Sequence, residues 1–591
     1  MRDSVSHRGR RAIGRLVRLM AFALGLLVSG PTASAVAQPV LSLAQGGKWS
    51  PAVRDDFYTI DQGSRLIPYR WAQALQRPDG SAFLGDGLAR YGYLPNPVSP
   101  TPGLPIGFML APEADGPVLA MNCSACHTRQ IEASGQVWRI DGGPAFADFA
   151  GLLTDIDTAV MSALSSDTAF SRLAGVVLGG QPTSLQVAAL RRAVEAWHVP
   201  YHTIIAASLP SPGLWGIGRL DAISMIFNRV AGLDVGPASA GGMIPANILP
   251  ADAPARYPFL WNASIQDRIQ WPGFAPNGSP IFALTRNTGE VLGVFGRFHP
   301  RKTVFGVDYK TGSSISLPGL WNLENLITKI GPPAFPGPVD AVLAQKGAAI
   351  FARAGASEPS CESCHGIAPG GLRPPSLETW HTPAQDVGTD TREWQVLGRK
   401  VDPGVLAGAF VPLSFPPEHL PAAGVPAAML LKVAVLGVIV DQLPTLVTAK
   451  ADLSALGQGS AAAPPDIADL LNWFRDPTDL PKPPPAGQFP YESRVLQGIW
   501  ATAPYLHNGS VPTLADLLKP AAERPARFAV GRAYDLARLG LATSQPTGPT
   551  STLTTTGCEA RNSGNSRCGH EFGVSLSPDD KAALLEYLKT L

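Results

Sequence analysis

The chain has 591 residues, and its 47 lysines and arginines nearly balance its 46 aspartates and glutamates, so the formal net charge is +1. A charge this close to zero gives no support for nucleic-acid binding or for an acidic tail. Glycine and proline, with 61 and 58 residues, make up about a fifth of the chain. This share is above the average and indicates long irregular segments, while the length suits two or three domains.

The N-terminus has the layout of a secretory signal peptide. An apolar run from Leu19 to Val28 is followed by small residues in Ala-x-Ala patterns between Ala33 and Ala37. The basic residues that precede the run include Arg8, Arg10, Arg11, Arg15 and Arg18. The run is short for a membrane span. We therefore expect residues 1–37 to be removed, leaving a periplasmic or secreted protein without a membrane span.

Two copies of Cys-x-x-Cys-His follow, far apart in the chain. They consist of Cys123, Cys126 and His127, and of Cys361, Cys364 and His365. Two thiols at this spacing can add to the two vinyl groups of one haem, and the adjacent histidine then binds the iron as proximal ligand. A structural zinc site would need further Cys or His pairs nearby, and a redox Cys-x-x-Cys does not need the histidine. The sequence therefore predicts two covalently attached c-type haems.

The region between the two motifs is irregular, with few clear elements. Helical patterns cover Phe146–Leu164 and Leu185–Trp197. Gly216–Arg219 resembles the start of a dinucleotide-binding loop but lacks the later glycine. A proline-rich stretch at Gly331–Pro338 reads as a connector. We expect an N-terminal haem domain with an insertion over residues 38–330 and a C-terminal cytochrome c-like domain over residues 331–591.

The C-terminal half contains the elements that surround the haem in a small cytochrome c. A helical pattern over Asp340–Ala354 leads into Cys361. The last stretch, Ser577–Leu591, begins with an N-cap serine and proline at the first helical position, and its leucines recur at helical spacing. We expect a helix in each of these segments, with the second packing across the haem.

Two further helices and a connector are expected between these segments. The apolar run Ala427–Val440 is short for a membrane span and reads as a buried helix. Another helix is expected over Asp466–Arg475, followed by a proline-rich connector at Pro481–Pro490.

The two remaining cysteines, Cys558 and Cys568, lie close together in a loop rich in Thr, Gly, Asn and Ser. Proteins in an oxidising compartment keep such cysteines as disulfides. We therefore predict a Cys558–Cys568 disulfide.

Several segments resemble the di-haem cytochrome c peroxidase and MauG superfamily, and within it the rubber oxygenase-like (RoxA-like) branch. Beyond the two haem motifs, these segments are Gln62–Tyr69, Val387–Asp390, Gly498–Leu514 and Gly569–Gly573, the last leading into the terminal Tyr587–Leu591. The resemblance implies a division of labour. The haem at His127 would keep an open site and react, and the haem at His365 would be six-coordinate and relay electrons.

The distal ligand of the second haem has two candidates. In small c-type cytochromes it lies on the loop before the terminal helix, where this chain has His570. The alternative is His507, at a position where superfamily members keep a histidine that lines the pocket. A bis-histidine iron is low-spin and of low potential compared with a His/Met pair. Either histidine could instead make no contact with iron.

No comparable ligand is apparent for the first haem, so we predict an open or water-filled site there. Three histidines are candidates only by elimination: His198, His202 and His299. Met109 and Met121 read as core residues.

The resemblance also implies roles for Trp271 and Glu290. Superfamily members carry a tryptophan between the two haems, although a core tryptophan is the plain alternative. Glu290 follows at about the spacing of the distal glutamate of peroxidase-type relatives, where a carboxylate can shuttle protons. A solvated loop charge is the alternative, and a shift of the loop would place Arg286 or Leu284 there instead.

Together these patterns predict a mainly α, loop-rich protein with two cytochrome c-like haem domains, the N-terminal one elaborated. The expected function is that of an exported oxidoreductase that activates peroxide or dioxygen at the first haem. Its partners would be a small cytochrome or cupredoxin donor, or a hydrophobic organic substrate. The alternative is a non-enzymatic electron-transfer di-haem cytochrome.

Overall fold

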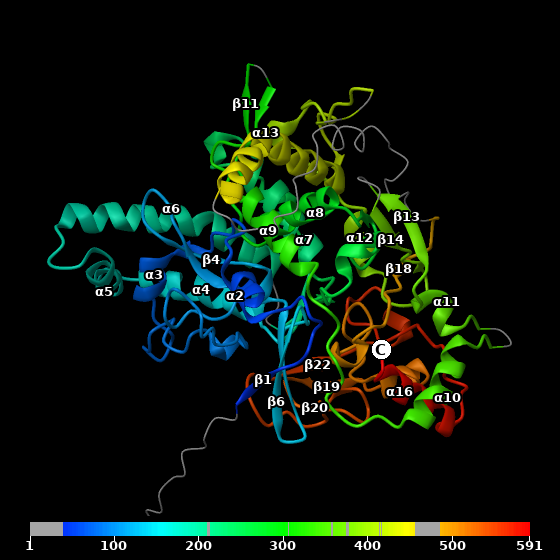
Figure 1. Ribbon diagram of the computed structural model, residues 1–591. Helices are drawn as coiled ribbons and strands as arrows, with labels where there is room; N and C mark the ends of the chain where they lie inside the picture. The colour runs from blue at the N-terminus through cyan, green and yellow to red at the C-terminus, as the bar shows by residue number, and fades with distance from the viewer. Residues whose placement is uncertain are drawn as a thin grey trace, which may run out of the picture. The chain divides into compact units, whose positions relative to one another are not determined.

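The computed structural model describes residues 39–209, 213–304, 306–355, 358–373, 377–412, 414, 416–455 and 485–591 (Figure 1). The predicted signal peptide and the predicted helix Asp466–Arg475 lie outside the described residues, as does the first part of the connector at Pro481–Pro490. Leu41–Leu591 form one compact unit.

Most helices begin at a serine, threonine or aspartate whose side chain accepts a hydrogen bond from the first turn, as N-caps do. The helices are α2 Pro51–Thr59, α3 Tyr69–Ala74, α4 Phe149–Leu164, α5 Asp167–Leu178, α6 Ser184–Ser208, α7 Ala222–Arg229, α8 Pro280–Gly293, α9 Leu317–Ile327, α10 Ala341–Ala352, α11 Cys361–His365, α12 Arg392–Leu397, α13 Ala427–Ala455, α15 Leu514–Leu517 and α16 Pro578–Leu588.

The strands are short and pair in two- and three-stranded sheets, some between consecutive strands and others between strands that are distant in the chain. They are β1 Val40–Ser42, β2 Ile67–Pro68, β3 Phe108–Ala111, β4 Val118–Met121, β5 Thr128–Ala133, β6 Gln136–Asp141, β7 Arg219–Leu220, β8 Ala255–Arg256, β9 Arg268–Ile269, β10 Ala275–Pro276, β11 Arg301–Thr303, β12 Gly306–Asp308, β13 Pro369–Arg373, β14 Leu377–Trp380, β15 Ala384–Gln385, β16 Lys400–Val401, β17 Val425–Pro426, β18 Tyr491–Glu492, β19 Arg527–Val530, β20 Tyr534–Asp535, β21 Gly540–Leu541 and β22 Ser551–Thr554.

The first Cys-x-x-Cys-His motif lies between two strands. β4 ends at Met121, and β5 begins at Thr128 and pairs with β6 in register from Thr128 opposite Asp141 to Ala133 opposite Gln136. Asn122 fixes the turn between them. Its Oδ1 accepts from the Ser124 N–H at 3.0 Å, and its Nδ2 donates to the carbonyl of Phe57 in α2 and to that of Ile60, just after α2. These hydrogen bonds hold the N-terminal side of the motif.

The second motif forms the short helix α11, which Ser360 caps by accepting from the Ser363 N–H. The predicted helices on either side of it are confirmed as α10 and α16, which lie side by side (Figure 1). Gly347 makes this close crossing possible, because a Cβ there would lie 2.0 Å from the carbonyl oxygen of Ala583. Any larger residue would push the two helices apart.

Helix α13 confirms the predicted buried helix over Ala427–Val440. It packs on α8 and α9, with Gly437 against the ring of Tyr309. Within the described part of the chain, its stretch Ala427–Pro444 is long and apolar enough to span a membrane, but 56% of that stretch is buried in the structure. This burial is what a core helix requires.

Two predicted helices of the insertion are confirmed as α4 and α6, but α6 runs on to Ser208, well past the predicted end at Trp197. Pro200 lies inside the helix and interrupts its hydrogen-bond ladder. The buried residues Tyr201, Ile204 and Ile205 follow it on one face. Their burial offsets the cost of the proline, which a local pattern does not reveal.

The proline-rich stretch near residue 331 is tied into the structure on both sides. The Gly331 N–H donates to the carbonyl of Gln45, and the indole of Trp500 donates to the carbonyl of Pro333 at 2.9 Å. The domain boundary at this stretch and the two cytochrome c-like domains stay predictions.

Candidate functional site

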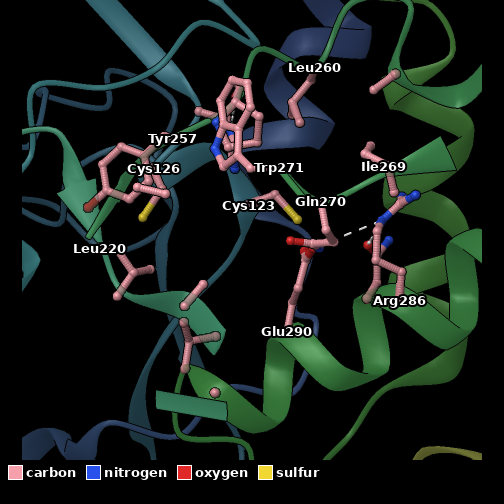
Figure 2. A pocket seen from close by; sticks show the side chains of 18 of the residues that line it. Cys123, Cys126, Leu220, Tyr257, Leu260, Ile269, Gln270, Trp271, Arg286 and Glu290 are labelled. Carbon is pink, nitrogen blue, oxygen red and sulfur yellow. Dashed lines mark hydrogen bonds and ion pairs between the residues drawn. The ribbon is translucent and has the colours of Figure 1, made fainter. Parts of the chain in front are cut away.

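Each Cys-x-x-Cys-His motif opens onto a cavity. The first cavity, lined by Cys123, Cys126 and His127, contains about 1420 Å³ of empty space, and Figure 2 shows it from close by. The second cavity, lined by Cys361, His365 and other residues, contains about 1180 Å³. These volumes include space that is open to solvent.

The two motif histidines are held in the same way. Nδ1–H of His127 donates to the carbonyl of Pro258 at 2.9 Å, and Nδ1–H of His365 donates to the carbonyl of Arg494 at 2.8 Å. Burial lowers the pKa of His127 to about 4 and lowers that of His365. Both rings are therefore neutral near pH 7 with Nε2 left as the acceptor, the state and orientation of a metal-bound histidine.

The four motif cysteines are free thiols, and none is in a disulfide. Cys123 Sγ lies 3.2 Å from the side-chain oxygen of Gln62, and Cys126 is buried. Burial raises the pKa of both of these thiols. They are therefore thiols rather than thiolates, and they are available for covalent attachment.

His570 faces His365 across the second cavity. The centroids of the two imidazole rings are 6.1 Å apart, and the ring planes make an angle of 49°. Metal–imidazole nitrogen bonds are about 2 Å long, so a metal held between two facing rings puts their centroids about 6 Å apart. Nδ1 of His570 is buried and has no hydrogen-bond partner among the described residues. This pair fits a bis-histidine site.

The loop that carries His570 is braced from three directions. The predicted disulfide between Cys558 and Cys568 is confirmed. Arg524 donates to the carbonyls of Gly569 and His570, at 2.7 and 3.0 Å. The His570 N–H donates to the carbonyl of Val387, at the start of the Val387–Asp390 segment. The position of the imidazole is therefore fixed by the backbone rather than by its own side-chain bonds.

His507 also lines the second cavity. Its ring stacks on Tyr491, with centroids 3.7 Å apart and an interplanar angle of 14°. Burial lowers its pKa to about 3. The stacking fixes His507 as part of the cavity wall.

The first cavity has no second histidine. Among the described residues that line it, His127 is the one histidine, and two methionines, Met121 and Met225, also contribute. The candidates considered by elimination lie elsewhere: His198 and His202 contact Asp157, and His299 lies 3.7 Å from Asp234. Met109 is buried in strand β3 and lies outside this lining.

Glu290 lies on helix α8 and points into the first cavity, toward Cys123 and Gln270 (Figure 2). Gln270 Nε2 donates to its Oε1 at 2.8 Å, and burial raises its pKa. Arg286 also reaches the cavity, but its guanidinium donates to Glu324 at 2.5 Å. Leu284 is buried and lies outside the lining. Arg286 Nε also lies 3.9 Å from Glu290 Oε1, and three further carboxylates line the cavity: Glu324, Glu393 and Glu492.

Trp271 belongs to a wall that the two cavities share. It lines both, together with Arg256, Phe259, Glu492 and Arg494. Its indole N–H donates to the Arg256 carbonyl at 3.0 Å, and the guanidinium of Arg256 lies 4.6 Å from the ring centroid. The indole is therefore fixed by a hydrogen bond and a cation–π contact between the two sites.

Arg494 was not singled out from the sequence, yet it connects the two motif histidines. Its guanidinium Nη1 donates to the carbonyl of Phe259 at 2.8 Å, one residue after the Pro258 that holds His127. Its own carbonyl accepts from His365. One residue thus braces both proximal histidines through main-chain carbonyls. In the sequence, its position shortly before the Gly498–Leu514 segment could have pointed to this residue.

The polar groups of the shared wall also suit a haem. Arg494 Nη2 is buried without a hydrogen-bond partner among the described residues, and Glu492 is the acidic neighbour at 2.8 Å from Nε. Buried guanidinium groups need an anion, and haem carries propionates. The thiol pairs, the oriented histidines and the buried arginines are all compatible with covalently attached haem.

Residues 490–529 match a protein-family model described as RoxA-like, cytochrome c-like. The matched segment includes Arg494 and His507. The chain is also similar to two proteins of Sinorhizobium fredii (strain NBRC 101917 / NGR234). It is 28% identical to the uncharacterized protein y4iJ, over 92% of each chain. It is 28% identical to the uncharacterized protein y4iM, over 56% of this chain and 63% of the other. The family match supports a c-type haem protein that acts in oxidation–reduction or electron transfer.

Proposed function

We propose that this protein is an exported di-haem c-type oxidoreductase of the cytochrome c peroxidase and MauG superfamily, in its RoxA-like branch. One haem is attached at Cys123 and Cys126 and the other at Cys361 and Cys364. The first cavity is the reaction site for peroxide or dioxygen, and the second serves as an electron relay.

The observation that carries this proposal is the asymmetry of the two cavities. His570 faces His365 at the separation expected of a bis-histidine metal site. The first cavity offers no second histidine opposite His127 among its described lining residues. A closed site that exchanges electrons and an open site that accepts a small oxidant together suit an enzyme better than a simple carrier.

A haem bound in the first cavity supplies an iron that can bind peroxide or dioxygen and exchange electrons. The chain supplies a carboxylate beside that position. Burial raises the pKa of Glu290, so it keeps a proton to a higher pH than an exposed carboxyl group does. Gln270 orients its Oε1, and His127 gains basicity by donating Nδ1–H to the carbonyl of Pro258.

The shared wall is the route between the sites. Trp271 contributes a polarisable ring that lines both cavities, and Arg494 holds backbone carbonyls that fix both proximal histidines. Electrons would pass between the two sites without movement of either residue. We assign Trp271 the role of electron-transfer intermediate and Arg494 a positioning role.

A small cytochrome or cupredoxin would serve as donor in peroxidase chemistry, and a hydrophobic organic molecule would be the substrate in oxygenase chemistry. The second candidate function is a non-enzymatic electron-transfer cytochrome. The methionines Met121 and Met225 in the first cavity are the observation that favours it, because a methionine ligand would close the site.

The test begins with the protein matured with haem in a periplasm. Haem content is measured for the native protein, for the Cys126→Ala variant and for the Cys364→Ala variant. Turnover is then measured with hydrogen peroxide and a reduced cytochrome, and separately as dioxygen uptake with an olefin. The proposal is supported if each variant carries less haem than the native protein and if the native protein turns over in one of the two assays. Full haem attachment with no turnover in either assay favours the carrier.

A further inference from the structure

A second group of potential metal ligands lies outside the two cavities, between helices α4 and α6. Asp157 lies on α4, and His198 and His202 lie one turn apart on α6. His198 Nε2 lies 2.8 Å from Asp157 Oδ1, and His202 Nδ1 lies 2.9 Å from Asp157 Oδ2. One ligand atom from each residue lies within 4.8 Å of the others. Within the described ranges, no other group of three such side chains meets this condition.

The carboxylate of this group has no cationic side chain beside it. Its side chain is 9% exposed, and its ion-pair partners in the described chain are the two histidines rather than a lysine or arginine. Burial alone would raise the pKa of Asp157, but the hydrogen bonds from His198 and His202 hold it below the usual value. The group is therefore a buried negative charge facing two imidazoles, and buried charges are normally paired or bound to a metal.

The ligand types select among metals. Two imidazole nitrogens and one carboxylate oxygen suit zinc and similar borderline divalent ions, whereas calcium and magnesium prefer oxygen ligands. Zinc bonds to these atoms are about 2.0–2.2 Å long. A tetrahedral ion therefore needs its ligand atoms somewhat farther apart than the present hydrogen bonds, but still inside the 4.8 Å limit that they meet. Small side-chain rotations are enough.

Access to the group is one-sided. The side chain of His198 is 11% exposed, whereas that of His202 is 47% exposed. Solvent can therefore reach the ion from the His202 side and supply a water as fourth ligand, as in zinc sites with three protein ligands.

We propose that Asp157, His198 and His202 form a binding site for a zinc-class divalent cation, with water in the fourth position. The ion takes the place of the two hydrogen bonds between the imidazoles and the carboxylate, and each ring then carries its one proton on the nitrogen that does not bind the ion. It thereby fastens α6 to α4 at the point where Pro200 interrupts the helical hydrogen bonds of α6. This site is independent of the haem cavities and of the proposed reaction.

The experiment uses the haem-loaded full-length protein, freed of loosely bound metal with a chelator, and zinc chloride alone as the probe. Zinc binding is measured by isothermal titration calorimetry, and the melting temperature is measured with and without zinc. The variants are Asp157→Asn and His202→Gln, which keep side-chain size and hydrogen bonding. His419→Gln is the matched control, because His419 is exposed and bonded to a main-chain carbonyl away from the group.

We expect native protein and the His419→Gln control to bind one zinc ion and to melt at a higher temperature with zinc. Both cluster variants should lose at least about 10- to 100-fold in affinity, since loss even of an outer-shell partner costs that much. Their haem spectra should match the native spectrum, which shows that folding is intact. Native protein that binds no zinc overturns the proposal, as does unchanged zinc affinity in both cluster variants. Equal binding of magnesium would also contradict it.

Discussion

The two Cys-x-x-Cys-His regions carry the same five-residue spacing in different settings. The first is a turn between β4 and β5, with Asn122 bonded into α2 on one side. The second is the helix α11, whose neighbours α10 and α16 pack across each other. In both, the proximal histidine donates Nδ1–H to a main-chain carbonyl. The two regions therefore share only the cysteine pair and the way in which the adjacent histidine is oriented.

The two cavities differ in the polar side chains that line them beside the motif. The second has His570 on a loop braced by a disulfide and by Arg524. The first has Glu290 from helix α8, held by Gln270. A ring nitrogen can complete the coordination of an iron, whereas a carboxylate with a raised pKa can handle protons. Under the proposed function, the motif would fix which cofactor is attached, and His570 and Glu290 would decide what that cofactor does.

The largest expected effect comes from the wall between the two regions. Trp271→Phe should keep both haems attached, because neither the thiols nor the histidines contact haem through this residue. Turnover should fall by orders of magnitude, since the two sites lose their shared indole. Haem content, melting temperature and turnover are measured on one preparation.

If Trp271 only fills space in the core, Trp271→Phe should lower stability and leave turnover unchanged. Trimming it to phenylalanine would cost about 1–3 kcal/mol of stability and leave turnover near normal in the folded protein. That result would remove Trp271 from the proposed function.

Glu290→Gln tests the carboxylate of the first region. If Glu290 moves a proton, turnover should fall about 10²-fold or more, with both haem spectra unchanged. Glu378→Gln, at an exposed position on β14, should leave turnover as it is.

The pH dependence of turnover shows whether Glu290 acts in its ionised form. Burial raises the pKa of Glu290 above the usual carboxyl range. If the ionised form accepts the first proton, turnover rises as the pH rises through this raised pKa and falls away below it. This acid limb should disappear in Glu290→Gln. If the acid limb of the pH profile persists in Glu290→Gln, the side chain that titrates there is not Glu290.

The distal side of the second region is tested by comparing two histidines. His570→Ala should convert the second haem from low-spin to high-spin, because its facing imidazole is lost. His507→Ala should leave it low-spin, because His507 is stacked on Tyr491 in the wall. Electron paramagnetic resonance of the oxidised protein distinguishes them. A low-spin second haem in His570→Ala would exclude His570 as its ligand.

Arg494→Gln should affect both regions together. The change removes a buried positive charge and leaves the nearby carboxylate of Glu492 without its partner. Added negative charge favours the oxidised iron, so both midpoint potentials should fall in a redox titration. Arg353→Gln, exposed at the end of α10, is the matched control. A shift at one haem alone would show that Arg494 does not serve both sites.

The smallest effect is expected for the brace of the distal loop. The Cys558–Cys568 disulfide closes a short loop, with a sequence separation of 10. Replacing both cysteines by alanine should cost about 3 kcal/mol of stability by the loop-closure relation. His570 should still bind, since Arg524 and the carbonyl of Val387 hold its backbone. Chemical denaturation followed by far-ultraviolet circular dichroism measures the loss.

Local patterns predicted the parts of the fold that depend on local chemistry. The N-cap serine and first-turn proline of Ser577–Leu591 marked a helix that the structure contains as α16. The short separation of Cys558 and Cys568 marked the disulfide. The two Cys-x-x-Cys-His motifs were apparent in the sequence because their residue types and spacing are typical of haem attachment. Each of these signals spans only a few neighbouring residues.

The features that the sequence did not reveal depend on residues distant in the chain. Arg494 matters because it contacts Phe259, 235 positions away. Gln270 matters because its amide reaches Glu290 on α8. The group of Asp157, His198 and His202 forms only when α6 continues past Pro200 and packs on α4. Periodicity and spacing carry no information on such contacts, since those contacts are made by tertiary packing.

The central claim, one open and one closed site, is tested most directly by titrating the fully reduced protein with carbon monoxide. Carbon monoxide needs an open position on ferrous haem. We expect one molecule to bind for every two haems in the native protein, and a second to bind in His570→Ala. Binding at both haems of the native protein would contradict the closed second site. No binding at all would contradict the open first site.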